Sequence, residues 1–336
     1  MKIKSSIFVI IIILFAFTLP VTSISINNNK IVNTDFSNIS QSEISDCCDD
    51  FYFIQITDTH VMHKLLDRDE EYKTLFCNLI NHINSFDNKP AFIVLTGDIV
   101  SFGCGILGAL NYKAALECVY KKDGQLYADS EYTIPIYSIP GNHDYMFSWN
   151  LLNYHRFIDN QHVVWNNILD LLEKRQLNDR YTITYENLTL FFLDSGHNYY
   201  LNLLEALQFK GSGISYWFDI EWLETALNNC TTKHKIILMH HPAINWGEHD
   251  IIARNKENFI KLVEGYSIDL VLAGHTHASR VFEKDGTFYP NNVLPFNCSN
   301  YPPLYVQTDA CKEGGYYRNI TISGNDIWLN PCEQFI

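Results

Sequence analysis

The sequence is short of positive charge. Its 336 residues contain 24 Lys and Arg against 38 Asp and Glu, which gives a net charge of −14. Because contacts to nucleic-acid phosphates need a positive surface, this balance argues against a nucleic-acid-binding protein. It does not exclude a phosphorylated substrate, since bound metal cations can reverse the sign of the local charge.

Two missing motifs narrow the chemistry further. No Cys-x-x-Cys pair occurs among the nine cysteines, which disfavours a zinc site made of cysteines. No Gly-x-Ser-x-Gly stretch occurs, so the nucleophile elbow of serine hydrolases is absent from the sequence. The composition, with 47% hydrophobic and 18% charged residues, excludes a disordered chain and is sufficient for a large buried core.

The N-terminal segment has the layout of a secretory signal peptide. Two lysines precede an apolar run over residues 7–17, and small or β-branched residues follow over 21–23. We predict a signal peptide over 1–23, a polar linker over 24–49 and a secreted or extracytoplasmic protein. An uncleaved membrane anchor at the N-terminus is the alternative. No later run of the sequence is long and apolar enough to span a bilayer.

Sequons and cysteines are both consistent with export. Candidate glycosylation sites of the form Asn-x-Ser/Thr occur at Asn38, Asn187, Asn229, Asn297 and Asn319. In an exported chain the nine cysteines are expected to form disulfides, with at least one thiol left over. The crowding of Cys298, Cys311 and Cys332 suggests that disulfides staple the C-terminal tail. Buried free thiols are the alternative.

From residue 50 onward, short apolar runs alternate with amphipathic stretches, which favours an α/β domain. The predicted strands are Phe51–Ile56, Ala91–Leu95, Ile136–Ser138, Thr189–Leu193, Lys235–Met239 and Asp269–Ala273. The predicted helices are Leu65–Asn84, Leu107–Tyr120, Trp149–Glu173, Phe218–Asn228 and Lys256–Glu264. Residues 50–283 are interpreted as the catalytic domain.

The C-terminal part of the chain, over 284–336, carries mostly turn and strand signals. Asp285-Gly286 is a hairpin signal, and the stretch over 323–326 is a second turn signal. We therefore predict a β-rich extension that packs on the same domain.

Polar clusters follow five of the predicted strands, at the point where each strand ends. They are Asp58-Thr59-His60, Gly97-Asp98, Gly141-Asn142-His143-Asp144, His240-His241 and Gly274-His275-Thr276-His277. Because ligands of open α/β sheets bind beyond the carboxyl ends of the strands, we expect these five clusters to meet at one sheet edge.

The residue types in these clusters are suited to divalent metal ions. Carboxylate oxygens and imidazole nitrogens are ligands for borderline cations. On an extended segment, Asp58 and His60 would point to the same side, and so would His275 and His277. One carboxylate can bridge two cations, and such a pair can activate water and hold the oxygens of a phosphoryl group. Without cations, so many acids and imidazoles in one cleft would be costly.

The five blocks, in this order, resemble the metallophosphoesterase (calcineurin-like phosphoesterase) superfamily. Its pattern is Asp-x-His, Gly-Asp, Gly-Asn-His-Asp/Glu, a lone His and Gly-His-x-His, and the sequence carries every block between Asp58 and His277. The resemblance implies a four-layer α/β sandwich of two mixed β-sheets flanked by helices. It also implies a phosphomonoesterase or phosphodiesterase that uses two divalent metal ions, chosen among Zn, Mn and Fe.

The resemblance further implies a role for each matching residue. One metal would be held by Asp58, His60, Asp98 and His277. The other would be held by Asp98, Asn142, His240 and His275, so that Asp98 bridges the pair. A hydroxide between the metals would attack phosphorus, and His143 would protonate the leaving oxygen. Asp144 would orient His143 by accepting a hydrogen bond from its other nitrogen, and His241 would face substrate or lie behind the ligands.

Two local details qualify the resemblance. Purple acid phosphatases of the superfamily carry Tyr three positions after the bridging Asp, where this sequence has Ser101, so a tyrosinate–iron site is not supported. The segment Leu193-Asp194-Ser195 is similar to cyclic-nucleotide-phosphodiesterase-like and acid-phosphatase-like members. Neither detail selects a substrate, so a phosphorylated small molecule and a lipid head group both fit.

Two other functions are alternatives to this one. The stretch Gly103–Gly108 matches the dinucleotide pattern Gly-x-Gly-x-x-Gly, but it lies too far past its strand, so a loop entering a helix is favoured. A metal-binding surface protein on the same fold, with little or no turnover, is the main alternative. The intact Asn142-His143-Asp144 block argues against that alternative, because a chain without turnover would be expected to lose it first.

Overall fold

The structure is a computed structural model. It describes residues 50–66, 70–103, 105–122, 125–126, 134–145, 154, 180–196, 220–246, 251–252, 255–301 and 303–335. The predicted signal peptide, the predicted linker and, apart from residue 154, the predicted helix over 149–173 lie outside these residues. Within the described ranges, no helix combines the length and apolarity needed to cross a membrane.

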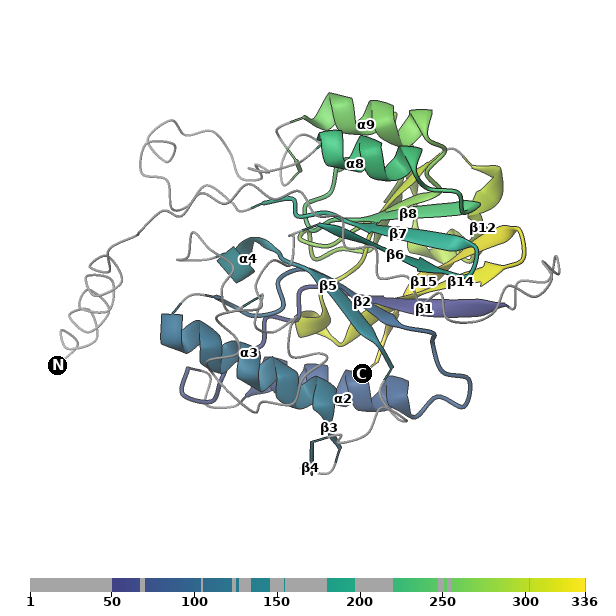
Figure 1. Cartoon of the computed structure of the whole chain (residues 1–336). Helices are drawn as coiled ribbons and strands as arrows, with labels where there is room; N and C mark the ends of the chain where they lie inside the picture. The colour runs from purple at the N-terminus through teal and green to yellow at the C-terminus, as the bar shows by residue number, and fades with distance from the viewer. Residues whose placement is uncertain are drawn as a thin grey trace, which may run out of the picture. The chain divides into compact units, whose positions relative to one another are not determined.

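Two mixed β-sheets form the centre of the fold (Figure 1). In spatial order, the six-stranded sheet consists of β12 (Phe296–Asn297), β15 (Asp326–Gln334), β14 (Tyr316–Ser323), β1 (Phe51–Ile56), β2 (Ile93–Thr96) and β5 (Ile136–Ile139). The seven-stranded sheet consists of β11 (Phe288–Tyr289), β10 (Arg280–Phe282), β13 (Leu304–Gln307), β9 (Leu270–Ala273), β8 (His234–Leu238), β7 (Leu188–Phe192) and β6 (Tyr181–Tyr185). Strands β1, β2 and β5 are parallel to one another, and so are β13, β9, β8 and β7.

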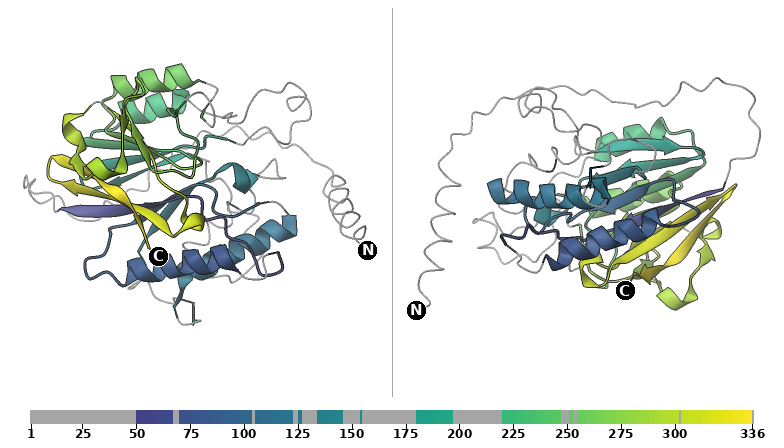
Figure 2. Two further views of the ribbon diagram at one scale, coloured as in Figure 1. Left: turned by 180° about the vertical axis from the view of Figure 1, so that it is seen from behind. Right: turned by 90° about the horizontal axis from the view of Figure 1, so that it is seen from below.

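Helices cover the outer face of each sheet. The pair α2 (Glu71–Asn84) and α3 (Gly105–Tyr120) lies against the first sheet, and the pair α8 (Ile220–Asn228) and α9 (Lys256–Gly265) lies against the second (Figures 1 and 2). The predicted four-layer sandwich is therefore confirmed. The short elements are the hairpin β3 (Lys121–Lys122) and β4 (Gln125–Leu126), the helix α4 (Asn142–Tyr145), and the 3₁₀ turns η2 (Asn291–Val293), η3 (Cys298–Asn300) and η4 (Cys311–Glu313).

The apolar strands are buried on both faces, which is why they read as continuous hydrophobic runs. In β1, Phe53 packs between the two sheets, whereas the next residue, Ile54, packs under α2 and α3. In β7, Leu190 and Phe192 pack between the sheets, whereas Phe191 packs under α8 and α9. Successive side chains thus feed two different cores, and each sheet is fixed from both sides.

Most predicted elements lie within one or two residues of the observed ones, and α2 is the exception. The predicted helix begins at Leu65, whereas α2 begins at Glu71. Residues earlier in the segment have other contacts: Val61 forms a β-bridge with Val100, and the backbone N–H of Leu66 donates to the carbonyl oxygen of His63. These contacts keep the segment after β1 from joining the helix.

The C-terminal strands belong to both sheets. Strand β14 pairs with β1, and β13 pairs with β9 in the interior of the second sheet. Both predicted turns join antiparallel neighbours, since Asp285-Gly286 links β10 to β11 and residues 324–325 link β14 to β15. The domain boundary at residue 283 stays a prediction.

The cysteines do not staple the tail, so that prediction is wrong. Cys298, Cys311 and Cys332 are free thiols. Cys298 packs between the sheets and Cys311 packs under α2 and α3, so the two lie in different layers and cannot meet. A disulfide instead joins Cys77 of α2 to Cys118 of α3. Cys47, Cys48 and Cys104 lie outside the described residues.

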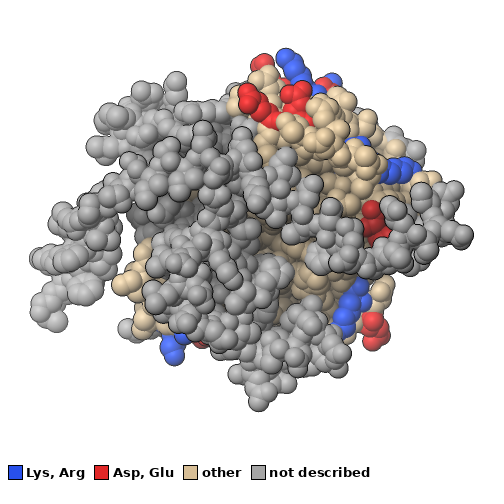
Figure 3. Space-filling model, in the orientation of Figure 1, with Lys and Arg blue, Asp and Glu red and all other residues tan. Residues whose placement is uncertain are grey.

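Acidic and basic side chains lie side by side on the described surface in the orientation of Figure 3. Among the ion pairs of the described residues, Lys284 at the start of the β10–β11 turn contacts Glu264 of α9. That the protein does not bind nucleic acid stays a prediction from its composition.

Candidate metal centre

The five polar clusters meet where strand ends of the two sheets come together. Three clusters follow β1, β2 and β5 of the first sheet, and two follow β8 and β9 of the second. Hydrogen bonds at the centre cross between the sheets. Nδ1 of His240 donates to the carbonyl oxygen of Thr96 at 2.8 Å, and the backbone N–H of His275 donates to Oδ2 of Asp58 at 2.9 Å. The centre therefore lies on the seam of the sandwich.

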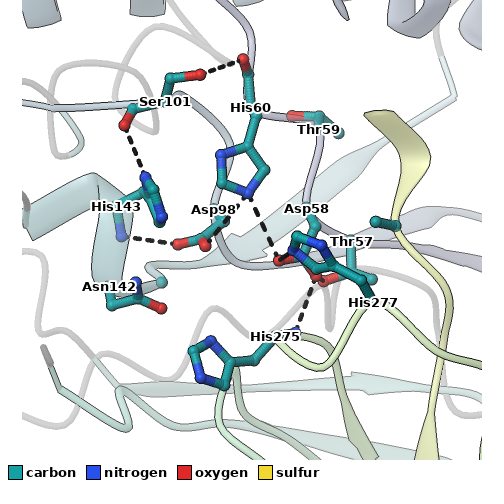
Figure 4. Close-up of polar contacts among 12 residues, drawn as sticks. Thr57, Asp58, Thr59, His60, Asp98, Ser101, Asn142, His143, His275 and His277 are labelled. Carbon is teal, nitrogen blue, oxygen red and sulfur yellow. Dashed lines mark hydrogen bonds and ion pairs between the residues drawn. The ribbon is translucent and has the colours of Figure 1, made fainter. Parts of the chain in front are cut away.

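A first group of ligand atoms consists of Asp58, His60 and His277 (Figure 4). Oδ1 of Asp58 lies 3.8 Å from Nε2 of His60 and 3.2 Å from Nε2 of His277. The second carboxylate oxygen of Asp58 is already used, because the Thr57 hydroxyl and the His275 backbone donate to it. Oδ1 of Asp58 and Nε2 of His60 are buried and make no hydrogen bond. Two buried, unsatisfied ligand atoms that face one point are what a bound cation would satisfy.

A second group surrounds Asp98, whose Oδ2 lies between two imidazoles. It is 3.5 Å from Nε2 of His60 and 3.4 Å from Nε2 of His240. Nε2 of His240 also lies 3.0 Å from Oδ1 of Asn142. Asp98 thus contacts members of both predicted ligand sets, which is the position that a bridging carboxylate needs.

His275 falls in a third group, with His240 and His241. Among the described residues, the ligand atoms of these three imidazoles lie within 4.8 Å of one another, and no such group contains both His275 and Asp98. The His241 ring is held from behind, since its Nδ1 lies 2.8 Å from the Ser195 hydroxyl. The structure therefore adds His241 as a candidate ligand for the second cation. The predicted ligand sets stay predictions.

The chemistry of this donor set suits divalent cations. Carboxylate, amide and imidazole atoms converge at one place, and they come from segments that are far apart in the chain. Zn²⁺, Mn²⁺ and Fe²⁺ all accept such mixed oxygen and nitrogen ligands. The residues present thus fit the two metal ions that the sequence predicts.

The backbone at the candidate ligands is strained. Positive φ angles occur at Asp58 (52°), His60 (46°), Asp98 (51°), His275 (70°) and His277 (47°). Such conformations cost roughly 1–3 kcal/mol each for residues other than glycine, and they persist only where the surroundings enforce them. The expectation of extended Asp-x-His and His-x-His segments is therefore wrong. His275 and His277 do not share a side, because each joins a different group.

Glycines let the ligand segments approach one another closely. A Cβ atom on Gly141 would lie 2.2 Å from Oδ1 of Asp98. A Cβ atom on Gly274 would lie 1.9 Å from the Thr57 hydroxyl and 2.6 Å from Oδ2 of Asp58. The glycines of the Gly-Asn-His-Asp and Gly-His-x-His blocks therefore make room for the two carboxylates.

The catalytic candidate His143 is held at both its backbone and its ring. Its backbone N–H donates to Oδ1 of Asp98 at 2.8 Å, and its Nδ1 donates to the carbonyl oxygen of Ser101 at 2.8 Å. The Ser101 hydroxyl in turn donates to the carbonyl oxygen of His60. Ser101, which stands where a metal-binding tyrosine would be in purple acid phosphatases, thus ties the β2 loop to the β1 loop.

Asp144 does not contact the His143 ring, so the predicted orienting hydrogen bond is wrong. Its buried carboxylate instead accepts bonds from the backbone of Ile99, Val100 and Gly141 and from the hydroxyl of Tyr112. The turn of α4 directs the Asp144 carboxylate back toward the β2 loop, and the Ser101 carbonyl takes the place beside His143. Asp144 therefore fixes the loop that carries Asp98.

Burial and neighbouring charges act in opposite directions on the pKa values at the centre. Burial alone would raise the pKa of Asp58, but His277 and His60 hold it well below its ordinary value. Burial would also raise the pKa of Asp98, but the nearby His240 outweighs burial and lowers the pKa of Asp98. Burial disfavours the cation of His240, but the Asp98 carboxylate outweighs it and raises the pKa of His240 to about 9. Protonated imidazole can thus balance the buried carboxylates when no metal does so.

The Gly-x-Gly-x-x-Gly stretch has a packing role. A Cβ atom on Gly103 would lie 2.0 Å from the carbonyl oxygen of Asp144, and one on Gly108 would lie 2.2 Å from the backbone of Gly103. The start of α3 thus packs tightly on the turn that carries His143 and Asp144. A loop entering a helix, as favoured from the sequence, is what the structure has.

Three contacts at the centre involve residues outside the five polar clusters. They are Tyr112 on Asp144, the Ser195 hydroxyl on His241, and Glu313 on His277. Ser195 belongs to the segment Leu193-Asp194-Ser195, which already resembled family members. Tyr112 and Glu313 belong to no recognisable motif, and only the fold brings them to the centre.

Sequence comparison finds a matching family model and two named relatives. A sequence model of the family described as calcineurin-like phosphoesterase matches residues 51–279. A probable glycerophosphodiester phosphodiesterase GpdQ from Arcobacter nitrofigilis is 27% identical over 232 residues, which cover 67% of this chain and 71% of that protein. A glycerophosphodiester phosphodiesterase GpdQ from Enterobacter lignolyticus is 26% identical over 214 residues, 60% of each protein.

Solved structures share the fold. A dimetal phosphatase from Danio rerio superposes with a TM-score of 0.54 at 12% identity, covering 84% of this chain and 96% of that one. The purple acid phosphatase PPD1 from yellow lupin (Lupinus luteus) superposes with a TM-score of 0.51 at 11% identity, covering 86% of this chain and 52% of that one. Both are similar in architecture, in agreement with the predicted sandwich.

Gly274→Ala tests whether close packing at the seam positions Asp58. The added methyl group would displace the Thr57 hydroxyl and the Asp58 carboxylate, so we expect lower metal content and a stability loss of about 1–3 kcal/mol. Elemental analysis of the purified protein and denaturant unfolding measure the two effects.

Gly265→Ala is the matched control, because a Cβ atom there meets nothing within 4 Å. It should keep both metal content and stability. A Gly274→Ala variant that equals Gly265→Ala in both measurements would show that this packing does not position the ligand.

Proposed function

The chain belongs to the calcineurin-like phosphoesterase family, and we propose that it hydrolyses small phosphodiesters of the glycerophosphodiester kind outside the cytoplasm. Membership makes it a metal-dependent phosphoester hydrolase. The observation that carries the proposal is the convergence of the buried, unsatisfied Asp58 Oδ1 and His60 Nε2 with the other five ligands predicted from the sequence, at one seam. The two curated relatives, both named as phosphodiesterases, favour a diester over a monoester.

The proposed centre holds two divalent cations. Asp58, His60, Asp98 and His277 would hold the first, and Asp98, Asn142, His240 and His275 would hold the second, with His241 nearby. Such cations act as Lewis acids on the phosphoryl oxygens and lower the pKa of an attacking water. The residues themselves fix where the charges lie, because Asp98 is anchored by the His143 backbone and by the loop that Asp144 holds.

His143 is the proposed proton donor to the leaving oxygen. The Ser101 carbonyl can only accept a hydrogen bond, so Nδ1 of His143 carries a proton and Nε2 is the nitrogen that faces substrate. The proposed acid is therefore the imidazolium form, in which Nε2 carries a second proton; it gives this proton to the ester oxygen as the phosphorus–oxygen bond breaks and leaves a neutral ring with its proton on Nδ1. The hydrogen bond from the His143 backbone to Asp98 holds this residue beside the carboxylate that would be shared by the two cations.

A substrate panel tests the proposed reaction. We expect the purified full chain to hydrolyse bis-para-nitrophenyl phosphate and glycerophosphoethanolamine faster than para-nitrophenyl phosphate, because the proposed substrate is a diester. A chelator should abolish turnover, and Zn²⁺, Mn²⁺ or Fe²⁺ should restore it. Faster cleavage of the monoester would assign a phosphomonoesterase instead. Metal binding without cleavage of any ester would support the alternative of a metal-binding protein without turnover.

His143→Ala tests the proton donor. Turnover should fall roughly 10²–10⁴-fold, because the leaving oxygen loses its acid, while metal content stays that of the wild type. Turnover and metal content must both be measured, because ligand atoms of His143, His60 and Asp98 also lie within 4.8 Å of one another and could hold a cation. Loss of metal would make His143 a ligand. His82→Ala on α2, where His82 packs on Phe86, is the control and should keep full turnover.

Export is the part of the proposal that concerns the N-terminus. The signal-like segment over 1–23 supports secretion, and the Cys77–Cys118 disulfide is typical of oxidising compartments. A membrane-anchored form with an uncleaved segment is the alternative. Among the sequons, Asn229 is exposed at the end of α8. Asn187 and Asn319 use their side-chain amides to bond Gly324 and Glu333.

Expression of the full chain in a eukaryotic secretory host tests export. The protein should accumulate in the medium with an N-terminus after Ser23, and Asn229→Gln should remove one glycan detected by glycosidase treatment and mass spectrometry. Asn187→Gln is the matched control, and it should leave the glycan pattern unchanged. A chain kept on membranes with its first residues intact would favour the anchor, and an unglycosylated cytosolic chain would contradict export.

A further inference from the structure

A carboxylate from the C-terminal segment contacts one of the candidate metal ligands. Oε1 of Glu313 lies 2.8 Å from Nδ1 of His277. The other ring nitrogen of His277, Nε2, lies 3.2 Å from Oδ1 of Asp58, inside the first ligand group. The family match ends at residue 279, so Glu313 lies beyond it. His277 is thus held between the candidate cation site on one side and a carboxylate on the other.

Main-chain contacts fix Glu313 in this place. It is the last residue of η4, which follows β13 and precedes β14. The backbone N–H of Cys311 donates to the carbonyl oxygen of Thr57 at 2.9 Å, and that of Lys312 donates to the carbonyl oxygen of Asp58 at 3.2 Å. The same three-residue turn therefore hydrogen-bonds to the loop that carries Asp58 and positions Glu313 beside His277.

The hydrogen bond also determines which His277 nitrogen carries the proton. An ionised carboxylate only accepts hydrogen bonds, so Nδ1 of a neutral His277 ring is the donor and Nε2 keeps its lone pair. That lone pair is on the side of Asp58 Oδ1, where a cation would bind. A negatively charged partner on Nδ1 also makes Nε2 a stronger electron donor to a metal.

We propose that Glu313 is a positioning residue of the metal centre, which orients His277 and strengthens its bond to the first cation. The proposal deepens the proposed function, because it concerns the same centre, but it depends only on cation binding and not on the identity of the ester. It predicts that a residue outside the five sequence blocks sets the affinity of one of the two cation sites.

The expected effect is on metal affinity. Loss of an outer carboxylate of this kind typically weakens metal binding by about 10–100-fold. Glu313→Ala should therefore weaken one of the two Zn²⁺-binding steps by about 10–100-fold. Glu313→Gln should lie between Glu313→Ala and the wild type, because the amide oxygen still accepts the hydrogen bond but carries no charge. The side chain of Glu313 is 49% exposed, so its removal should leave the metal-free fold intact.

The experiment uses the full chain, stripped of metal. Zn²⁺ affinity is measured by competition with a chromophoric chelator, and melting temperature is measured with and without Zn²⁺. Glu333→Gln is the matched control, because Glu333 is a carboxylate of the same C-terminal segment that accepts a hydrogen bond from Tyr317 and not from a candidate ligand. This control should bind Zn²⁺ as the wild type does.

The proposal is supported if the affinity order is wild type, then Glu313→Gln, then Glu313→Ala, with equal melting temperatures of the three metal-free proteins. It is overturned if Glu313→Ala binds Zn²⁺ as tightly as Glu333→Gln. It is also overturned if Glu313→Ala lowers the metal-free melting temperature while the Zn²⁺-induced shift stays that of the wild type. Turnover is not a readout here, so an inactive wild type would count against the proposed function alone.

Discussion

Two buried carboxylates are the constraint around which the centre is organised. Asp58 and Asp98 are 0% and 1% exposed. Within the described part of the chain, the ion pairs of both are with histidines, which carry charge only when protonated. Burial of an unpaired charge costs several kcal/mol, so the fold needs either protonated imidazoles or bound cations at this place. Both carboxylates also have positive φ angles, and such strained backbone shows that the surrounding structure holds these charges in place against this cost.

The packing of the two sheets keeps these charged residues close together. A single sheet would place Asp58 and Asp98 at one edge with their imidazole partners on one side only. Here the second sheet brings His240 and His275 across the seam, and each makes a hydrogen bond to the first sheet. Gln55, buried between the sheets, adds a further link by donating to the Ala273 carbonyl oxygen. The apolar core between the sheets therefore fixes the distance between the two halves of the metal centre.

How much of the fold and of the metal centre the sequence predicts differs between strands, candidate ligands, backbone conformation and hydrogen-bond partners. The strands were predictable, because side chains buried on both faces leave continuous apolar runs such as Phe51–Ile56. The candidate ligands were predictable, because each follows a strand end and the blocks keep the family order. Local conformation was not, since the positive φ angles of Asp58 and His277 come from tertiary contacts. The sequence predicts that Asp144 accepts a hydrogen bond from the His143 ring, whereas the Ser101 carbonyl does so in the structure. Proximity in sequence does not determine where a turn directs a carboxylate.

The C-terminal segment shows most clearly why motifs alone are insufficient. Its sequence reads as an extension, and the family match stops before it. In the structure, however, β13 lies between β10 and β9, and β14 lies between β15 and β1, so neither sheet is complete without it. The turn between these two strands reaches the Asp58 and His277 loops because its flanking strands pair with the very strands, β9 and β1, that end in those loops. Strand register, rather than any local signature, is what carries Glu313 to the metal centre.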